Sequence, residues 1–156
     1  MKPMPGPTHA LLPRAPAPCT PDAVPDAGRR VMVTLPGRPD QVPKARAFAR
    51  RLLGQQHSCA DTVVLLLSEL MTNAVLHSRS ARAGGRVTIA ITHSRTAVLV
   101  EVTDDGSDTK PSLHPANGHG EHGYGLVLVE ASATRWGCVR NGAESTTCWF
   151  EVRAVS

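Results

Sequence analysis

An apolar segment with three polar side chains at helical spacing most constrains the fold of this chain. It runs from Leu65 to Ser78 (LLLSELMTNAVLHS) and carries Glu69, Asn73 and His77 four residues apart. Residues four apart lie on the same side of an α-helix, so the segment predicts a largely apolar helix with one polar stripe. A buried carboxylate or amide without a partner costs on the order of a few kcal/mol. The stripe therefore needs partners, which either the protein core or a bound ligand could supply.

Composition limits which kinds of protein this chain can be. At 156 residues it is one domain, or one domain with a tail. No run approaches the ~18 apolar residues of a membrane-spanning helix, and no compact apolar stretch at the N-terminus is typical of a signal peptide. We therefore expect no membrane association and a cytoplasmic location. The net charge of +4 is mild and aromatic residues make up 3%, so direct nucleic-acid binding is not expected.

The four cysteines show no metal-binding or disulfide pattern. Cys19, Cys59, Cys138 and Cys148 form no CxxC spacing and accompany no paired histidine motif. We therefore expect reduced thiols, with Cys138 and Cys148 acting as small hydrophobic residues in strands.

A change in composition near residue 28 divides the chain. Residues 1–28 are rich in alanine and in proline, from Pro3 to Pro25. Closely spaced prolines remove backbone donors and favour extended, solvated chain, so we expect a disordered tail over 1–28 and a folded domain over 29–156.

Hydrophobic periodicity predicts an α+β sandwich. Asp40 is expected to cap the first helix, and Ser58 with Asp61 to form an approximate capping box for the central one. The expected elements in order are a strand over 30–35, helices over 40–53 and 58–78, strands over 86–93 and 97–103, a helix over 126–134, and strands over 135–140 and 146–152. This order favours a two-layer sandwich with a mixed, mostly antiparallel sheet and helices on one face.

Two glycine-containing segments are typical of a nucleotide site. Asp104-Asp105-Gly106 follows a strand, where a carboxylate can accept a hydrogen bond from an exocyclic amine beside a glycine that admits a flat ligand. Gly123 and Gly125 precede a helix, whose N-terminal N–H groups can point at phosphate oxygens.

The polar segment between these glycine motifs, residues 107–122, is long enough to predict a functional lid. Its His114, His119 and His122 are either solvated or a metal site; the sequence leaves both open.

Glu69 and Asn73 complete this set of candidates. Their oxygens, one helical turn apart, suit a hydrated Mg²⁺ ion and an attacking water or hydroxyl group.

Three segments in this order resemble the GHKL family of ATP-binding domains, which includes histidine kinases and gyrase B. ELMTNAVLH is similar to its N-box, DDGSD to its first glycine box and HGYGLVLVEASATRWG to its second. The resemblance covers residues 30–152. The short length of the chain and the sequence of the second glycine box are most similar to the actinobacterial anti-sigma factor and serine kinase branch.

The resemblance implies ATP and Mg²⁺ as cofactors. At the phosphate end, Asn73 would coordinate Mg²⁺, and Glu69 would act as general base or orient the attacking oxygen. Gly123 and Gly125, with Leu126 following them, would close onto the phosphates.

At the adenine end, the resemblance implies that Asp104 binds the adenine amino group and that Gly106 leaves space for the ring. Thr147 would support the contact from the neighbouring strand. Asp108 stands where the family has a second glycine. Asp105 and Asp108 could disfavour phosphate unless they face water or a metal ion.

The resemblance further implies partners. The first hypothesis is a serine/threonine kinase that phosphorylates an anti-anti-sigma-like protein and sequesters a sigma factor, with a homodimer as its expected assembly. The alternative is a non-catalytic protein-binding module controlled by nucleotide.

Overall fold

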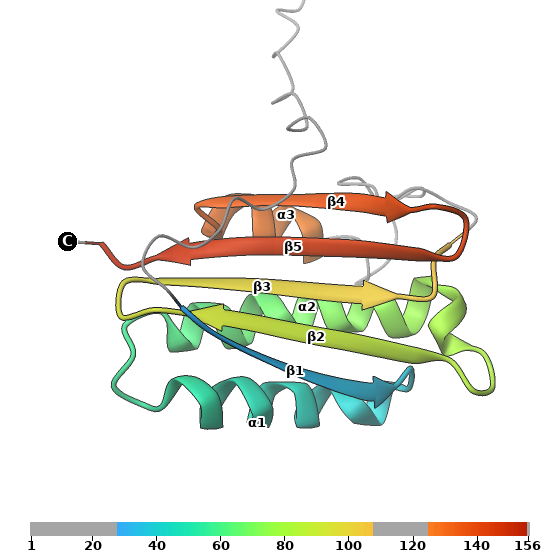
Figure 1. Cartoon of the computed structure of the whole chain (residues 1–156), viewed down its shortest axis with the longest axis horizontal. Helices are drawn as coiled ribbons and strands as arrows, with labels where there is room; N and C mark the ends of the chain where they lie inside the picture. Colours follow the sequence, from blue (N-terminus) through green and yellow to red (C-terminus); the bar gives the residue numbers. More distant parts are fainter. Residues whose placement is uncertain (1–27, 108–124, 156) are drawn as a thin grey trace, which may run out of the picture.

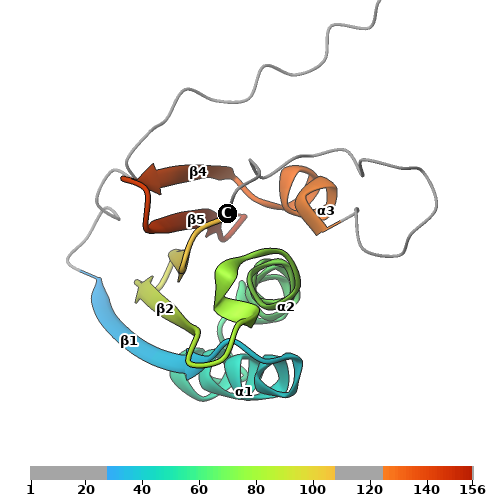
Figure 2. The ribbon, with the colours of Figure 1, turned by 90° about the vertical axis from the view of Figure 1, so that its right-hand side faces the viewer.

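A five-stranded antiparallel sheet carries three α-helices on one face in the computed structural model, which describes residues 28–107 and 125–155 (Figures 1 and 2). The strands lie in the order β1-β2-β3-β5-β4. The elements are β1 (Arg29–Pro36), α1 (Val42–Leu53), α2 (Ala60–His77), β2 (Arg86–His93), β3 (Ala97–Asp104), α3 (Gly125–Ser132), β4 (Arg135–Asn141) and β5 (Ser145–Arg153), with short 3₁₀ turns at Pro39–Gln41 and Arg79–Ala81. The predicted sandwich is confirmed, but every strand pairing in the described residues is antiparallel, so the sheet is not mixed.

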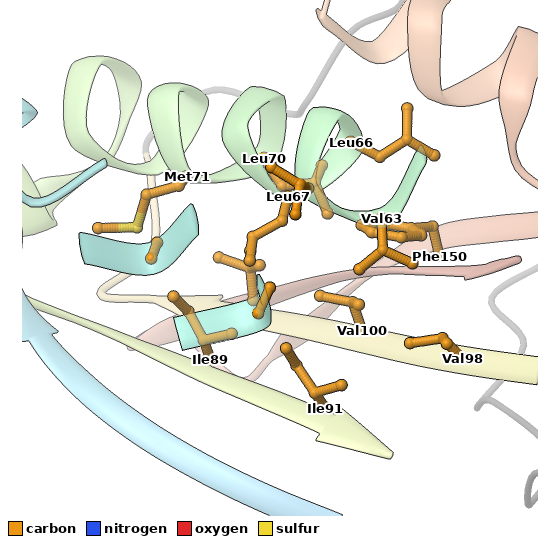
Figure 3. Packing of buried hydrophobic residues seen from close by; sticks show 14 of the residues in the cluster. Val63, Leu66, Leu67, Leu70, Met71, Ile89, Ile91, Val98, Val100 and Phe150 are labelled. Carbon is orange, nitrogen blue, oxygen red and sulfur yellow. The ribbon is translucent and has the colours of Figure 1, made fainter. Parts of the chain in front are cut away.

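The core lies between α2 and the sheet. Alternate residues of β2 and β3 point at the helices, and the apolar residues of α2 meet them (Figure 3). The largest fully buried apolar side chains are Phe150, Leu66, Leu67, Met71, Ile89 and Ile91. Each contributes about 1.5–3 kcal/mol through burial. The predicted apolar helix is therefore the element on which the sheet packs.

Both predicted helix caps are wrong. Asp40 lies in the 3₁₀ turn before α1, where Arg38 binds its carboxylate at 3.0 Å and holds its pKa below the usual range. α1 begins after Gln41 without a side-chain cap.

The start of α2 also differs from the predicted capping box. The helix begins after Cys59, whose N–H donates to Nδ1 of His57 at 3.2 Å. Asp61, with its side chain 94% exposed, pairs instead with Arg50. Neither α1 nor α2 therefore has a side-chain hydrogen bond from its N-cap residue.

The expectation of reduced thiols at Cys138 and Cys148 is also wrong. The two residues lie directly opposite each other in β4 and β5, with their Cα atoms 4.0 Å apart, and form a disulfide. Spacing along the sequence did not indicate the pair, because the register of the hairpin brings them together. Cys59 is free and buried.

Several sequence predictions fall outside the described residues. They are the tail before residue 28, Asp108, the lid histidines and Gly123. Over the parts of the chain with a described structure, no helix combines the length and apolar character needed to cross a membrane.

The packing of α2 makes a direct stability prediction. Leu67 is fully buried and Leu65, on the same helix, is 46% exposed. Leu67→Ala should lower the free energy of unfolding by about 2–5 kcal/mol because it leaves a cavity. Leu65→Ala is the matched control and should cost less than about 1 kcal/mol. Urea unfolding followed by circular dichroism measures both, and equal losses would contradict the observed packing.

Candidate functional site

The polar stripe of α2 lies at the edge of the helix–sheet interface. Glu69 and Asn73 are half-buried and His77 is exposed. Neither Glu69 nor Asn73 forms a side-chain hydrogen bond with another residue in ranges 28–107 and 125–155. Exposed Leu65 and Leu76 flank them on the same helix. The core therefore does not supply the partners of this stripe within the described chain, and its oxygens are available to a ligand.

Asp104 ends β3 on the face of the sheet that the helices cover. Its face follows from the alternation of β3, because Val100 and Val102 on that face are buried in the core. Oδ1 accepts a hydrogen bond from the Gly106 N–H at 2.7 Å. Oδ2 has no hydrogen-bond partner among the described residues, so it can accept a hydrogen bond from a ligand.

Burial raises the pKa of the Asp104 carboxyl. The Gly106 N–H opposes this effect, while the nearby Asp105 carboxylate adds to it. The folded state therefore favours the neutral carboxyl, and the ionised group at neutral pH lowers stability. An ionisable side chain whose pKa is shifted by burial is typical of a functional site.

Thr146, rather than Thr147, lies beside Asp104. In the register of β3 and β5, Asp104 is opposite Thr146, and Thr103 is opposite Thr147. The side chain of Thr147 lies on the other face of the sheet, with its Oγ1 2.8 Å from Oγ1 of Thr103. Asn141 donates to the same oxygen at 2.9 Å. The buried Thr146 therefore lies on the same side of the sheet as Asp104, and the predicted support of an adenine contact by Thr147 stays a prediction.

The carboxylate of Asp105 is occupied by a structural contact. Its Oδ2 accepts a hydrogen bond from the Arg86 N–H at 2.9 Å, at the start of β2. The buried Ser80 hydroxyl accepts from the Asp105 N–H at 2.8 Å and donates to the Arg86 carbonyl at 2.7 Å. Asp105 thus fixes the turn after β3, and its charge is partly compensated by these donors.

Gly106 is required by backbone conformation. Its φ is +79°, and a Cβ at this position would lie 2.7 Å from Nη2 of Arg79. A side chain would therefore strain the backbone and displace the guanidinium. The predicted space for a ring stays a prediction.

Arg79 is a site residue that the sequence did not identify. Its N–H donates to the Gly106 carbonyl at 2.8 Å, and its Nε to the Asp105 carbonyl at 3.1 Å. Nη2 donates to the Ala143 carbonyl at 2.7 Å, in the turn between β4 and β5. One side chain thus joins the end of α2 to two turns at the same end of the sheet. The available signal was its position immediately after the predicted helix.

The second glycine motif is described only from α3 onward. Gly125 is the first residue of this helix and Leu126 the second, and α3 packs beside α2 (Figure 2). Gly123 lies outside the described residues, so its predicted phosphate contact is untested. Within the described chain, no group of three His, Cys, Asp or Glu side chains could hold a metal ion.

The contacts of Arg79 predict a local effect on stability. Arg79→Ala removes charge-assisted hydrogen bonds to two carbonyl groups and should lower the free energy of unfolding by about 1–3 kcal/mol. Arg82→Ala is the matched control, because Arg82 is exposed and forms no side-chain hydrogen bond with the described residues. Urea unfolding and amide exchange at Gly106 measure the difference. Equal stability of the two variants would contradict the structural role of Arg79.

Comparison with known protein families gives a match over most of this chain. The family model described as "Histidine kinase-like ATPase domain" matches residues 35–150. The matched range contains the polar stripe of α2, the turn after β3 and all of α3. The chain matches none of the curated proteins with which it was compared. Because the family match spans most of the chain, this protein belongs to the family of histidine kinase-like ATPase domains.

Proposed function

We propose that this protein is an ATP-binding regulator that phosphorylates a serine or threonine of a partner protein. Family membership supports ATP binding, with kinase or ATPase activity as the general class. The finer assignment rests mainly on one observation: Glu69 and Asn73 lie one turn apart at the open edge of α2 without partners in the described residues. The described fold makes no side-chain hydrogen bonds through these two residues, so their presence points to a ligand.

The donor set fits ATP and Mg²⁺. The amide oxygen of Asn73 and the carboxylate of Glu69 are hard oxygen ligands of the kind that Mg²⁺ prefers. Bound Mg·ATP would supply the phosphoryl group and the charge neutralisation of its transfer. Asn73 would hold the metal ion, and Gly125 with Leu126 would place the first turn of α3 near the phosphates.

The chain's own residues would then do three things. Asp104 would accept a hydrogen bond from the adenine amino group through its free Oδ2, with Thr146 beside it in β5. Arg79 and Gly106 would keep that turn in position. Glu69 would orient the acceptor hydroxyl and receive its proton during transfer.

The proposed partners follow the same assignment. We propose an anti-anti-sigma-like protein as phosphoryl acceptor, a sigma factor as the sequestered partner, and the cytoplasm as their location. The motifs similar to the anti-sigma factor branch, ELMTNAVLH and GYGLVLVEASATRWG, support this proposal.

Asp104 provides the first functional test. Asp104→Asn replaces an acceptor oxygen with a donor facing the adenine amine, so ATP affinity should fall roughly a hundredfold. Stability should not fall, because the raised pKa shows that the ionised carboxylate is unfavourable in the folded state. Titration with a fluorescent ATP analogue and urea unfolding measure the two effects.

Asp61→Asn makes the same chemical change at an exposed position of α2 and is the matched control. It should leave ATP affinity unchanged. An Asp104→Asn variant that binds within threefold of wild type would place the adenine elsewhere.

Variants at Glu69 and Asn73 distinguish a kinase from a nucleotide-controlled binding module. Glu69→Gln should leave ATP affinity nearly intact and slow phosphoryl transfer by roughly 10²–10⁴-fold, since general-base assistance is lost. Asn73→Ala should weaken Mg²⁺-dependent ATP binding and transfer together. Single-turnover phosphorylation of a partner captured from the host measures transfer on the same preparations. Wild-type protein that binds Mg·ATP and its partner without phosphorylating it would support the binding module and exclude the kinase.

A further inference from the structure

The Cys138–Cys148 disulfide lies on the same face of the sheet as Asp104. Cys148 is opposite Val102 in β3 and packs against the core that the helices cover. Side chains two residues apart in a strand share a face, and Cys148 is two residues after Thr146 in β5. The disulfide is therefore next to the Asp104–Thr146 pair on that face. The crosslink is therefore adjacent to the candidate adenine contact.

The crosslink joins an edge strand to the sheet. In the described sheet β4 has β5 as its only neighbouring strand. Arg140, two residues after Cys138, is opposite Thr146 and donates to the Ser107 carbonyl at 3.0 Å. Ser107 directly follows Gly106. The position of β4 is thus coupled by one side chain to the turn that carries Asp104.

A second arginine contacts the same end of the hairpin. Nη2 of Arg79 donates to the Ala143 carbonyl in the β4–β5 turn, and its Nε donates to the Asp105 carbonyl. The free end of the hairpin and the turn after β3 are therefore joined by two arginines. Any loosening of β4 relative to β5 would disturb both contacts.

Backbone pairing holds the β4–β5 hairpin together in addition to the disulfide. Backbone hydrogen bonds already pair β4 with β5 from Arg135 to Asn141, and the two cysteines are only 10 residues apart in sequence. A crosslink between residues this close in sequence removes less chain entropy than one that closes a long loop. Both cysteines are half-buried, whereas Cys59 is 2% exposed. The cysteine pair is therefore partly exposed to solvent, unlike Cys59.

We propose that Cys138 and Cys148 form a reversible thiol–disulfide site whose oxidation state sets nucleotide affinity. Oxidation proceeds by exchange with a small-molecule disulfide. One cysteine thiolate attacks the small-molecule disulfide, which forms a mixed disulfide and releases one small-molecule thiol. The second cysteine thiolate then attacks the mixed disulfide at the protein sulfur and releases the second small-molecule thiol. Two electrons pass from the cysteines to the oxidant, and the two protons leave with the released thiols. A dithiol reductant reverses both steps.

The oxidised protein binds ATP more tightly. The crosslink holds β4 so that Arg140 and the turn after β3 are already ordered before the nucleotide arrives. Ordering one side chain on binding lowers affinity by roughly two- to twelvefold. The inference rests on the proposed nucleotide binding, which it extends to a form of regulation.

The test compares ATP affinity in two oxidation states of the full chain. Wild-type protein is treated with oxidised glutathione or with dithiothreitol, and each form is titrated with Mg·ATP. Mass spectrometry after alkylation should show two more modified thiols in the reduced form. Affinity should be roughly two- to twelvefold higher in the oxidised form, as expected for one pre-ordered side chain.

Serine variants identify the cysteines responsible. The double variant C138S/C148S should bind ATP like the reduced wild type and show no response to reductant. Cys19 and Cys59 remain in it, so a response through either of them would persist and overturn the assignment. If the double variant is unstable, the single variant C138S makes the same comparison.

Three other outcomes are informative. Equal ATP affinity of the two wild-type forms would overturn this inference and leave ATP binding intact. Failure of the pair to oxidise would also overturn it. Absence of ATP binding in both forms would overturn the proposed function as well, so the two failures can be distinguished.

Discussion

The packing of α2 against the sheet is the interaction on which the rest of the structure depends. One side of this helix fills the core with large apolar residues such as Leu67 and Met71, and these meet Ile89 and Phe150 from the strands. Once that side is fixed, the stripe with Glu69 and Asn73 has to lie at the edge of the interface. The same contact that stabilises the fold therefore positions two oxygen-bearing side chains where a ligand can reach them.

The candidate site forms at the end of the sheet because several turns meet there. Asp104 ends β3, Thr146 lies opposite it in β5, and Arg140 lies opposite Thr146 in β4. Arg79 follows the last turn of α2 and donates hydrogen bonds to the turn after β3 and to the turn between β4 and β5. Backbone carbonyls satisfy its guanidinium, so the positive charge also stabilises the geometry of the turn that carries Asp104.

Sequence periodicity predicted the fold well, because alternation and helical spacing report burial directly. It failed where the outcome depends on register between strands. A shift of one residue moves a side chain to the opposite face, so only the register shows that Thr146, and not Thr147, is opposite Asp104. The Cys138–Cys148 pair was missed for the same reason. The predicted helix caps failed because the Asp40 carboxylate binds Arg38, two residues before it, and the Asp61 carboxylate pairs with Arg50 of α1.

The polar residues of the site differ in what the fold gains from them. Asp105 and Arg79 are bound to backbone groups, so the fold itself accounts for their presence. Asp104 is half-buried with a raised pKa and one free oxygen, and Glu69 and Asn73 have no partners in the described residues. Such groups cost stability or contribute none. Within the proposed function, a ligand with an amine at one end and phosphates at the other would supply partners to all three side chains.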